Sequence, residues 1–146
     1  MKIIIGINGS KQSDAAIEAC GKFIKSAAQI KIISVIEQNY MIGAEPFVVA
    51  AELYAEVEAN ERKLAAERVK NAENKLREMF NGTETEIISE ILSGNPSQKI
   101  VEEAEIAKAD LIIVGSHGYG FWERAMIGSV SDSVIHHAPC SVLVVK

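Results

Sequence analysis

Residues 111–145 decide the fold, and they read LIIVGSHGYGFWERAMIGSVSDSVIHHAPCSVLVV. Apolar runs at 111–115 and 141–145 are nearly continuous in Ile, Leu and Val, which is typical of parallel strands covered on both faces. Between the runs, apolar residues recur at helical spacing and stop before a proline: Val130, Val134 and Ala138, then Pro139. The stretch predicts a strand, a helix over Ser129–His137 and a second strand.

The same alternation extends back to the start of the chain. Three further apolar runs predict strands at Lys2–Ile7, Ile30–Ile36 and Thr85–Leu92. Between them, apolar residues three or four positions apart predict helices. The inner faces are Ala16, Ile17, Cys20, Phe23, Ile24 and Ala27 in the first helix, Leu53, Val57, Leu64, Ala65, Val69, Ala72, Leu76 and Met79 in the second, and Ile100, Val101, Ala104 and Ala107 in the third.

The third predicted helix has a clear start. Asn95 is a suitable N-cap, and Pro96 fits the first helical position. We expect residues 39–51, which precede the second helix and contain Gly43 and Pro46, to form a loop. The whole pattern predicts one α/β domain over residues 1–146, a Rossmann-like three-layer sandwich. Its five-stranded parallel sheet carries helices on both faces, joined by right-handed crossovers.

Composition limits the function classes. The 146 residues are 48% hydrophobic and 24% charged, with a net charge of -5. An acidic chain is a poor partner for nucleic acid or an anionic membrane, which both attract basic surfaces. No run approaches the ~20 apolar residues of a membrane span, and the apolar opening is too short for a signal peptide. We expect a cytoplasmic protein without nucleic-acid or membrane partners.

Glycines gather where the fourth predicted strand ends. In an open parallel sheet, ligands bind outside the carboxyl ends of the strands. Gly115 and Gly118 follow the strand as G-x-x-G, and after nine residues Gly128 and Ser129 open the last helix. Glycine lets an anion approach the main chain, and a helix start offers unpaired N–H groups. The pattern predicts a phosphate cradle, in which Ser129 and Ser131 either cap the helix or donate to phosphate.

This spacing, together with the ending HAPCSVLVV at 137–145, resembles the ATP-binding class of the universal stress protein family. The likeness runs from the first predicted strand to the last. It implies an adenine nucleotide alpha hydrolase-like fold, ATP as the cofactor and a homodimer paired through the C-terminal strand. It also implies a nucleotide-dependent regulator in the stress response, with an unidentified protein partner.

The resemblance implies a site built largely from main-chain groups. The family commonly has Asp where this chain has Asn8, and an amide brings no charge to a magnesium ion beside the phosphates. ATP binding is therefore expected, whereas Mg²⁺ and hydrolysis stay open, with at most a slow ATPase and no catalytic residue assigned. The implied binding residues are Gly6, Ile7, Asn8, Val35, Val114, Gly115, His117, Gly118, Gly128, Ser129, Val130 and Ser131.

Two functions remain open from the sequence. One is the ATP-binding dimeric regulator, which the glycine spacing favours. The other is a dimeric interaction module of the same fold that holds no nucleotide, for which Asn8 leaves room. Neither metal nor redox chemistry is indicated. Cys20 and Cys140 are far apart and are expected to be buried thiols, while the adjacent His136 and His137 point about 100° apart on a helix and cannot share a metal ion.

Overall fold

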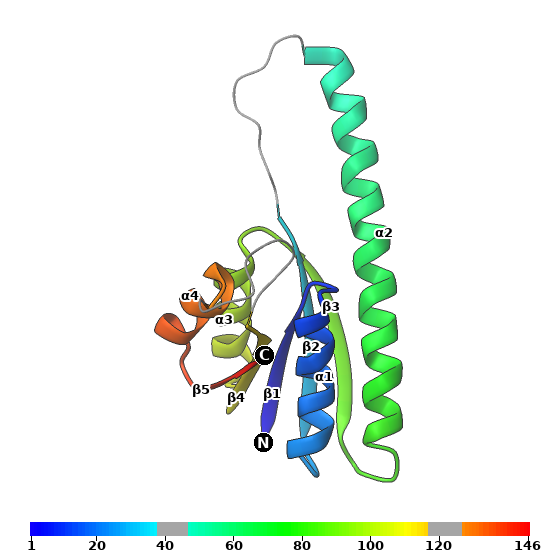
Figure 1. The fold of residues 1–146 in the computed structure, drawn as a ribbon. Coiled ribbons are helices and arrows are strands. Elements are labelled where there is room, and N and C mark those ends of the chain that lie inside the picture. Colours follow the sequence, from blue (N-terminus) through cyan, green and yellow to red (C-terminus); the bar gives the residue numbers. More distant parts are fainter. Residues whose placement is uncertain (38–46, 117–126) are drawn as a thin grey trace.

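A computed structural model describes residues 1–37, 47–116 and 127–146, and within α2 it describes no side chains before residue 55. Strands and helices alternate along the whole chain (Figure 1). The strands are β1 (Lys2–Ile7), β2 (Gln29–Ile36), β3 (Glu86–Ser93), β4 (Leu111–Gly115) and β5 (Ser141–Val145). The helices are α1 (Lys11–Phe23), α2 (Phe47–Met79), α3 (Pro96–Ala107) and α4 (Ser129–His137).

The five strands form one parallel sheet in the order β3-β2-β1-β4-β5. The chain runs outward from β1 through β2 to β3, then crosses back to β4 on the other side of β1 and ends at the edge strand β5. The strand order therefore reverses between β1 and β4. This is the predicted α/β fold, and the strand bounds agree with the sequence prediction to within a residue.

The alternation of side chains along the strands divides the core into two halves. On one face, the odd-numbered isoleucines of β1 pack against α1 and α2 through Ile17, Val69 and Leu76. On the other face, Ile4 and Ile112 pack against α3 and α4 through Ile100 and Val134. Full burial of one such side chain contributes about 1.5–3 kcal/mol. The central strands read as continuous apolar runs because both of their faces are covered.

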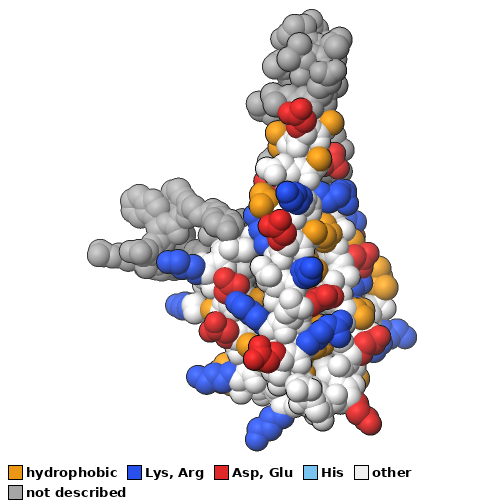
Figure 2. Space-filling view, turned by 90° about the vertical axis from the view of Figure 1, so that its right-hand side faces the viewer, with side chains coloured by type: hydrophobic (Ala, Val, Ile, Leu, Met, Phe, Trp, Pro, Cys, Tyr) orange, Lys and Arg blue, Asp and Glu red, His pale blue; other side chains and the backbone are white. Residues whose placement is uncertain are grey.

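Helix α2 is much longer than the sheet that it covers. Its 33 residues span about 50 Å, roughly twice the length of an eight-residue strand. Among the side chains described from residue 55 on, the first buried one is Ala65, and the preceding part of the helix projects beyond the body of the protein (Figure 1). Val57 was predicted to face the core but is 54% exposed, because the sheet does not reach it. Acidic and basic side chains are interspersed over the outer surface of α2 (Figure 2).

Two helix ends differ from the sequence prediction. Helix α1 ends at Phe23, whose side chain is 64% exposed. Ile24 and Ala27 reach the core from the segment after the helix. The second difference is the start of α2, which already begins at Phe47, inside the expected loop 39–51. The part of that loop over 38–46 lies outside the described residues.

The predicted cap of α3 is confirmed. Asn95 Oδ1 accepts from Gln98 N at 3.1 Å, and Pro96 occupies the first turn.

Lys31 of β2 forms ion pairs with two carboxylates, Glu103 of α3 and Glu90 of β3. Its Nζ lies 2.5 Å from Glu103 and 2.6 Å from Glu90. Burial opposes the charge on Lys31, but the two carboxylates outweigh it and raise its pKa.

The two cysteines lie in different environments. Cys20 is fully buried, as predicted, and burial raises the pKa of its thiol to about 12. Cys140 was also expected to be buried but is only partly so, since it stands just before the edge strand β5. Partial burial and the charge of Asp110 raise its thiol pKa. Among the described residues, no helix combines the length and apolar character that crossing a membrane requires.

Candidate functional site

The carboxyl ends of β2, β1 and β4 lie side by side at one edge of the sheet (Figure 1). Gly6 pairs in register with Val114, and Ile7 pairs with Ser34, next to Val35. After β1 the chain turns into α1 on one face, whereas α4, which follows β4 in the chain order, covers the other face. Open α/β sheets bind ligands outside the carboxyl ends of the strands at such a reversal point.

The start of α4 is tied directly to the end of β4. Gly128 N donates to Ser116 O at 2.7 Å, and Ser116 N donates to Val145 O at 2.6 Å. The Ser131 hydroxyl donates to the carbonyls of Gly115 and Ser116 at 3.0 and 3.1 Å. These bonds hold the first turn of α4 beside the strand ends. We call residues 6–8, 114–116 and 128–131 together the strand-end rim.

The N-cap of α4 is neither of the two serines considered in the sequence. Gly128 is the N-cap, so neither Ser129 nor Ser131 caps the helix. The hydroxyl hydrogen of Ser131 is directed at strand carbonyls, and its side chain is 2% exposed. Asp132 N already donates to Gly128 O at 2.9 Å. The N–H groups of Ser129, Val130 and Ser131 precede it in the first turn, where a helix provides no carbonyl for them.

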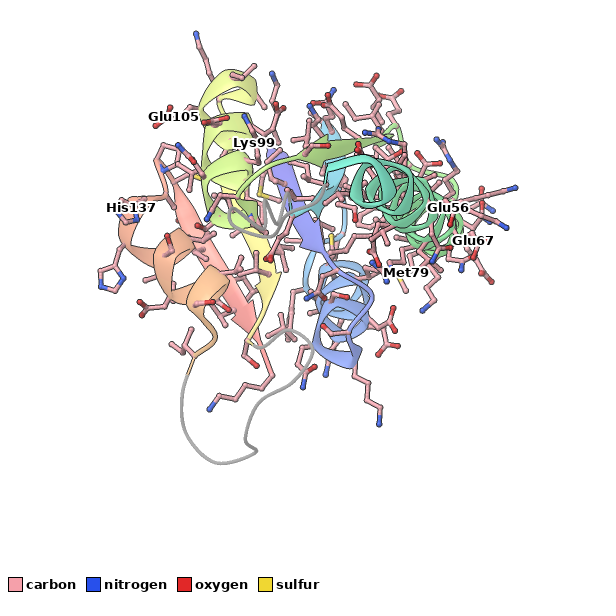
Figure 3. All side chains as sticks on the ribbon, turned by 90° about the horizontal axis from the view of Figure 1, so that it is seen from above. Glu56, Glu67, Met79, Lys99, Glu105 and His137 are labelled. Carbon is pink, nitrogen blue, oxygen red and sulfur yellow. The ribbon has the colours of Figure 1, made fainter. Side chains whose placement is uncertain are left out.

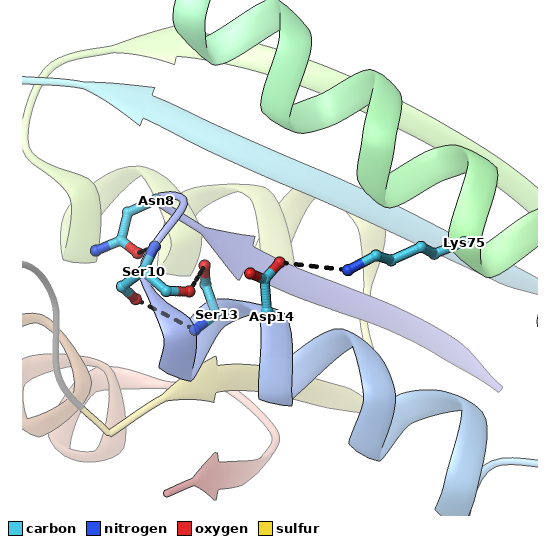
Figure 4. A network of polar contacts seen from close by, with 5 residues as sticks. All are labelled: Asn8, Ser10, Ser13, Asp14 and Lys75. Carbon is cyan, nitrogen blue, oxygen red and sulfur yellow. Dashed lines mark hydrogen bonds and ion pairs between the residues drawn. The ribbon is translucent and has the colours of Figure 1, made fainter.

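A second turn of the rim follows β1 and is held by side chains (Figure 4). Gly9 has φ +79°, a conformation that other residues rarely adopt, and it reverses the chain after Asn8. Asn8 Oδ1 accepts from Ser10 N at 3.0 Å. Ser10 in turn caps α1, accepting from Ser13 N at 3.2 Å. Asn8 therefore stabilises the turn through its oxygen, and its own side chain is exposed.

The glycine at the end of β4 has a structural reason that the sequence did not reveal. A Cβ added to Gly115 would lie 2.7 Å from the backbone carbon of Gln12 in the first turn of α1. Gly6 is similar, since an added Cβ would lie 2.7 Å from Cδ1 of Ile100 in α3. Both glycines thus let helices approach the sheet closely. The close approach of α1 is a second reason for a glycine at position 115, beside the predicted access of an anion to the main chain.

The structure brings most of the predicted site residues together. Ile7 and Val114 are 6% and 3% exposed with their side chains in the core, so at the rim they offer main-chain groups. His117 and Gly118 lie outside the described residues. Sequence reasoning missed Ser116, which joins β4, β5 and α4, and Arg68, whose stem crosses Gly9 from α2. The only signal for Ser116 was its position directly after the strand.

The histidine pair lies away from the rim. Nδ1 of His136 bonds to Asp132 O and Nδ1 of His137 bonds to Ser133 O, both at 2.8 Å, and both rings are exposed. Viewed onto the carboxyl ends of the strands, His137 and Glu105 project outward from the periphery (Figure 3). Within the described ranges, no group of three or more His, Cys, Asp or Glu side chains is placed to hold a metal ion.

Comparison with known proteins places this arrangement in context. The profile of the Universal stress protein family matches residues 1–146. Universal stress protein MJ0531 of Methanocaldococcus jannaschii is 37% identical over 99% of this chain and 81% of its own length. The solved structure of hypothetical protein MJ0577 superposes with a TM-score of 0.84 at 26% identity, covering 99% of this chain and 94% of that one.

A third protein was solved with a nucleotide. It is the universal stress family protein At3g01520 of Arabidopsis thaliana, with AMP bound. Its TM-score is 0.70 at 21% identity, and the match covers all of this chain and 91% of the other. At that identity the likeness shows a shared fold.

Proposed function

This chain belongs to the universal stress protein family, and from that premise we propose that it binds ATP at the strand-end rim and acts as a nucleotide-dependent regulator. The observation that carries the proposal is the first turn of α4, where three N–H groups without intrahelical acceptors lie beside the carboxyl ends of β1 and β4. These groups, together with the partial positive charge of a helix start, suit phosphate oxygens.

The remaining rim residues fit the rest of the nucleotide. Main-chain groups of Ile7 and Val35 stand at neighbouring strand ends, where an adenine edge can form hydrogen bonds with them. The structural neighbour from Arabidopsis holds AMP, a smaller adenine nucleotide. Gly118 and His117, which the family resemblance implies as further contacts, belong to the same proposal.

Asn8 brings no negative charge to a magnesium ion beside the phosphates. Asn8 is the polar side chain of the β1 end, and its carboxamide oxygen already accepts from Ser10 N. The protein's own contribution is therefore to bind and orient the phosphates through amides, while a metal bound with the nucleotide would supply charge neutralisation. We assign no catalytic residue.

The proposal is tested by nucleotide content and by one pair of variants. One sample of the freshly purified protein is denatured, and the released small molecules are separated by chromatography. A second, folded sample is freed of nucleotide and titrated with ATP, AMP and cyclic AMP. We expect ATP near one per chain. If the purified protein holds no nucleotide and also fails to bind ATP, the proposal is wrong, and the alternative function, an interaction module without nucleotide, is favoured.

The paired variants separate the amide of Ser129 from its hydroxyl. Proline is tolerated at the first helical position and lacks an N–H, and Gly128 already has the extended conformation, φ -66° and ψ 156°, that a residue before proline adopts. Ser129→Pro should therefore keep α4 but weaken ATP binding about 10- to 100-fold, the value of one charge-assisted hydrogen bond. Ser129→Ala keeps the amide and should change the affinity less. Equal affinities for all three proteins would contradict the cradle.

We further propose that two chains pair through β5. This strand forms one edge of the sheet, and its residues 142–145 are only half-buried. Val145 O faces β4, where it accepts from Ser116 N. Since successive residues of a strand point their main-chain groups to opposite sides, Val142 and Val144 present theirs to the open edge. An apolar open edge favours pairing with a second strand.

A further inference from the structure

A cleft of about 200 Å³ lies between α1, α2 and the turn after β1, on the sheet face opposite α3 and α4. Its floor is apolar and consists of Ile7, Ile17 and Ala72, which are 2–6% exposed. With ~30 Å³ of liquid volume per water molecule, this space corresponds to roughly seven waters. The cleft is large enough for a small organic molecule.

Polar side chains form the mouth of the cleft. Arg68, Asn71 and Lys75 follow one another on a single face of α2, three to four residues apart. Across the cleft, Asp14 of α1 pairs with Lys75, with Oδ1 at 3.7 Å from Nζ (Figure 4). No described carboxylate forms an ion pair with Arg68. The described mouth thus has two cations, one of which is already neutralised.

Arg68 is held in place by the turn beside it. An added Cβ at Gly9 would lie 2.6 Å from Arg68 Nε and 2.8 Å from Cδ, so the stem of the arginine lies directly against the turn. The side chain is half-buried. A guanidinium fixed by its stem loses less rotamer freedom on binding, and its planar fork matches the two oxygens of a carboxylate.

We infer that this α1/α2 cleft binds a small organic monocarboxylate. The carboxylate pairs with Arg68, the Asn71 amide provides a neighbouring donor, and the apolar part of the ligand covers the floor. The net charge at the mouth selects the class of ligand: two cations and one anion leave +1, which one carboxylate balances. A phosphate monoester carries close to two negative charges at neutral pH, and would have to compete with Asp14 for Lys75. The cleft shares Ile7 with the strand-end rim, but the cleft uses its side chain and the rim its main chain, and the inference does not rest on nucleotide binding at the rim.

The test uses benzoate, with benzamide as its neutral counterpart and phenylphosphate as the dianion. Nucleotide-free protein is titrated with each probe while backbone amide NMR shifts are followed. We expect benzoate to shift the amides of Gly9, Ser13 and Asn71, and the other two probes to bind at least tenfold more weakly. Equal binding of benzoate and benzamide, shifts confined to other regions, or no benzoate binding would each overturn the inference.

Matched variants locate the charge that matters. Arg68→Gln should weaken benzoate binding at least tenfold. Arg62→Gln, six residues earlier on α2 and paired with Glu58 at 3.5 Å, should have no effect. Asp14→Asn raises the charge of the mouth to +2 and should strengthen both benzoate and phenylphosphate. Thermal unfolding confirms that each variant is folded. If Arg68→Gln and Arg62→Gln behave alike, the proposed role of Arg68 is wrong.

Discussion

Replacing Gly115 with alanine tests whether the rim depends on close contact between α1 and β4. An added Cβ would lie 2.7 Å from Gln12 C and 2.8 Å from Gln12 O. Carbon atoms are ordinarily in contact at about 3.5–4.0 Å. The obstacle is backbone in the first turn of α1, so it cannot rotate away, and the helix must shift by roughly an ångström.

Overpacking of this kind costs about 1–3 kcal/mol. Replacing glycine with alanine also restricts the unfolded chain, which stabilises the folded protein by about 0.4–1 kcal/mol and offsets part of this cost. We therefore expect Gly115→Ala to lower the free energy of unfolding by about 1–2 kcal/mol. For a chain of this size, that corresponds to a fall in Tm of roughly 3–8 °C.

Gly6→Ala is the matched control, since it adds the same methyl group to the adjacent strand. Its nearest obstacle, also at 2.7 Å, is Cδ1 of Ile100, the far end of a flexible side chain. We expect a loss of less than about 1 kcal/mol. Urea denaturation of both variants gives the comparison. A Gly115→Ala protein as stable as the wild type, or less affected than Gly6→Ala, would refute the reasoning.

Three other predictions concern the thiols, the half-buried Lys31–Glu103 ion pair and the edge strand. Cys20 has a thiol pKa of about 12 and no exposure, so it should resist a thiol reagent at pH 8 until the protein unfolds, since only about one molecule in 10⁴ carries the thiolate. Any slow labelling of the native protein should come from Cys140 and disappear in Cys140→Ser. Labelling that persists in this variant would contradict the prediction. Lys31→Met leaves the carboxylate of Glu103, whose side chain is 14% exposed, without its cation and should cost about 1–3 kcal/mol at pH 7 in urea denaturation. Because the folded-state pKa of Lys31 is raised from 10.5, the contribution of the ion pair to the free energy of unfolding is complete below pH 10.5. It declines as the pH rises through the folded-state pKa. A destabilisation by Lys31→Met that grows as the pH rises would contradict this. Val144→Pro removes an outward N–H from β5 and should convert a dimer to a monomer in light scattering, whereas an unchanged mass would exclude pairing at this edge.

The fold could be predicted because the strands and helices differ in period. The continuous isoleucines of β1 and β4 have no solvent-facing positions, which indicates a sheet covered on both sides. Helix periodicity alone could not show where α2 leaves the body of the protein. Val57 fits the apolar stripe as well as Val69 does, yet only Val69 has a strand beneath it. Which part of a helical stripe is buried depends on the length of the partner sheet.

The sequence pattern indicated which residues lie together at the strand ends, and it indicated less well why those residues are there. Gly115 ends β4 as predicted, and its lack of a side chain also makes room for α1. Ser131 was expected to cap the helix or contact phosphate, and its hydroxyl instead joins α4 to β4. Arg68 could not be linked to Gly9 from sequence, because 59 positions separate them and only the packing of α2 brings them into contact.

The most direct measurement of the central proposal is the amide NMR spectrum of isotopically labelled, nucleotide-free protein during titration with ATP. The account predicts that the largest shifts fall on the N–H groups of Ser129, Val130 and Ser131, with smaller ones at Ile7, Asn8 and Val35. If ATP at saturating concentration leaves the first turn of α4 unshifted, the helix start does not hold the phosphates.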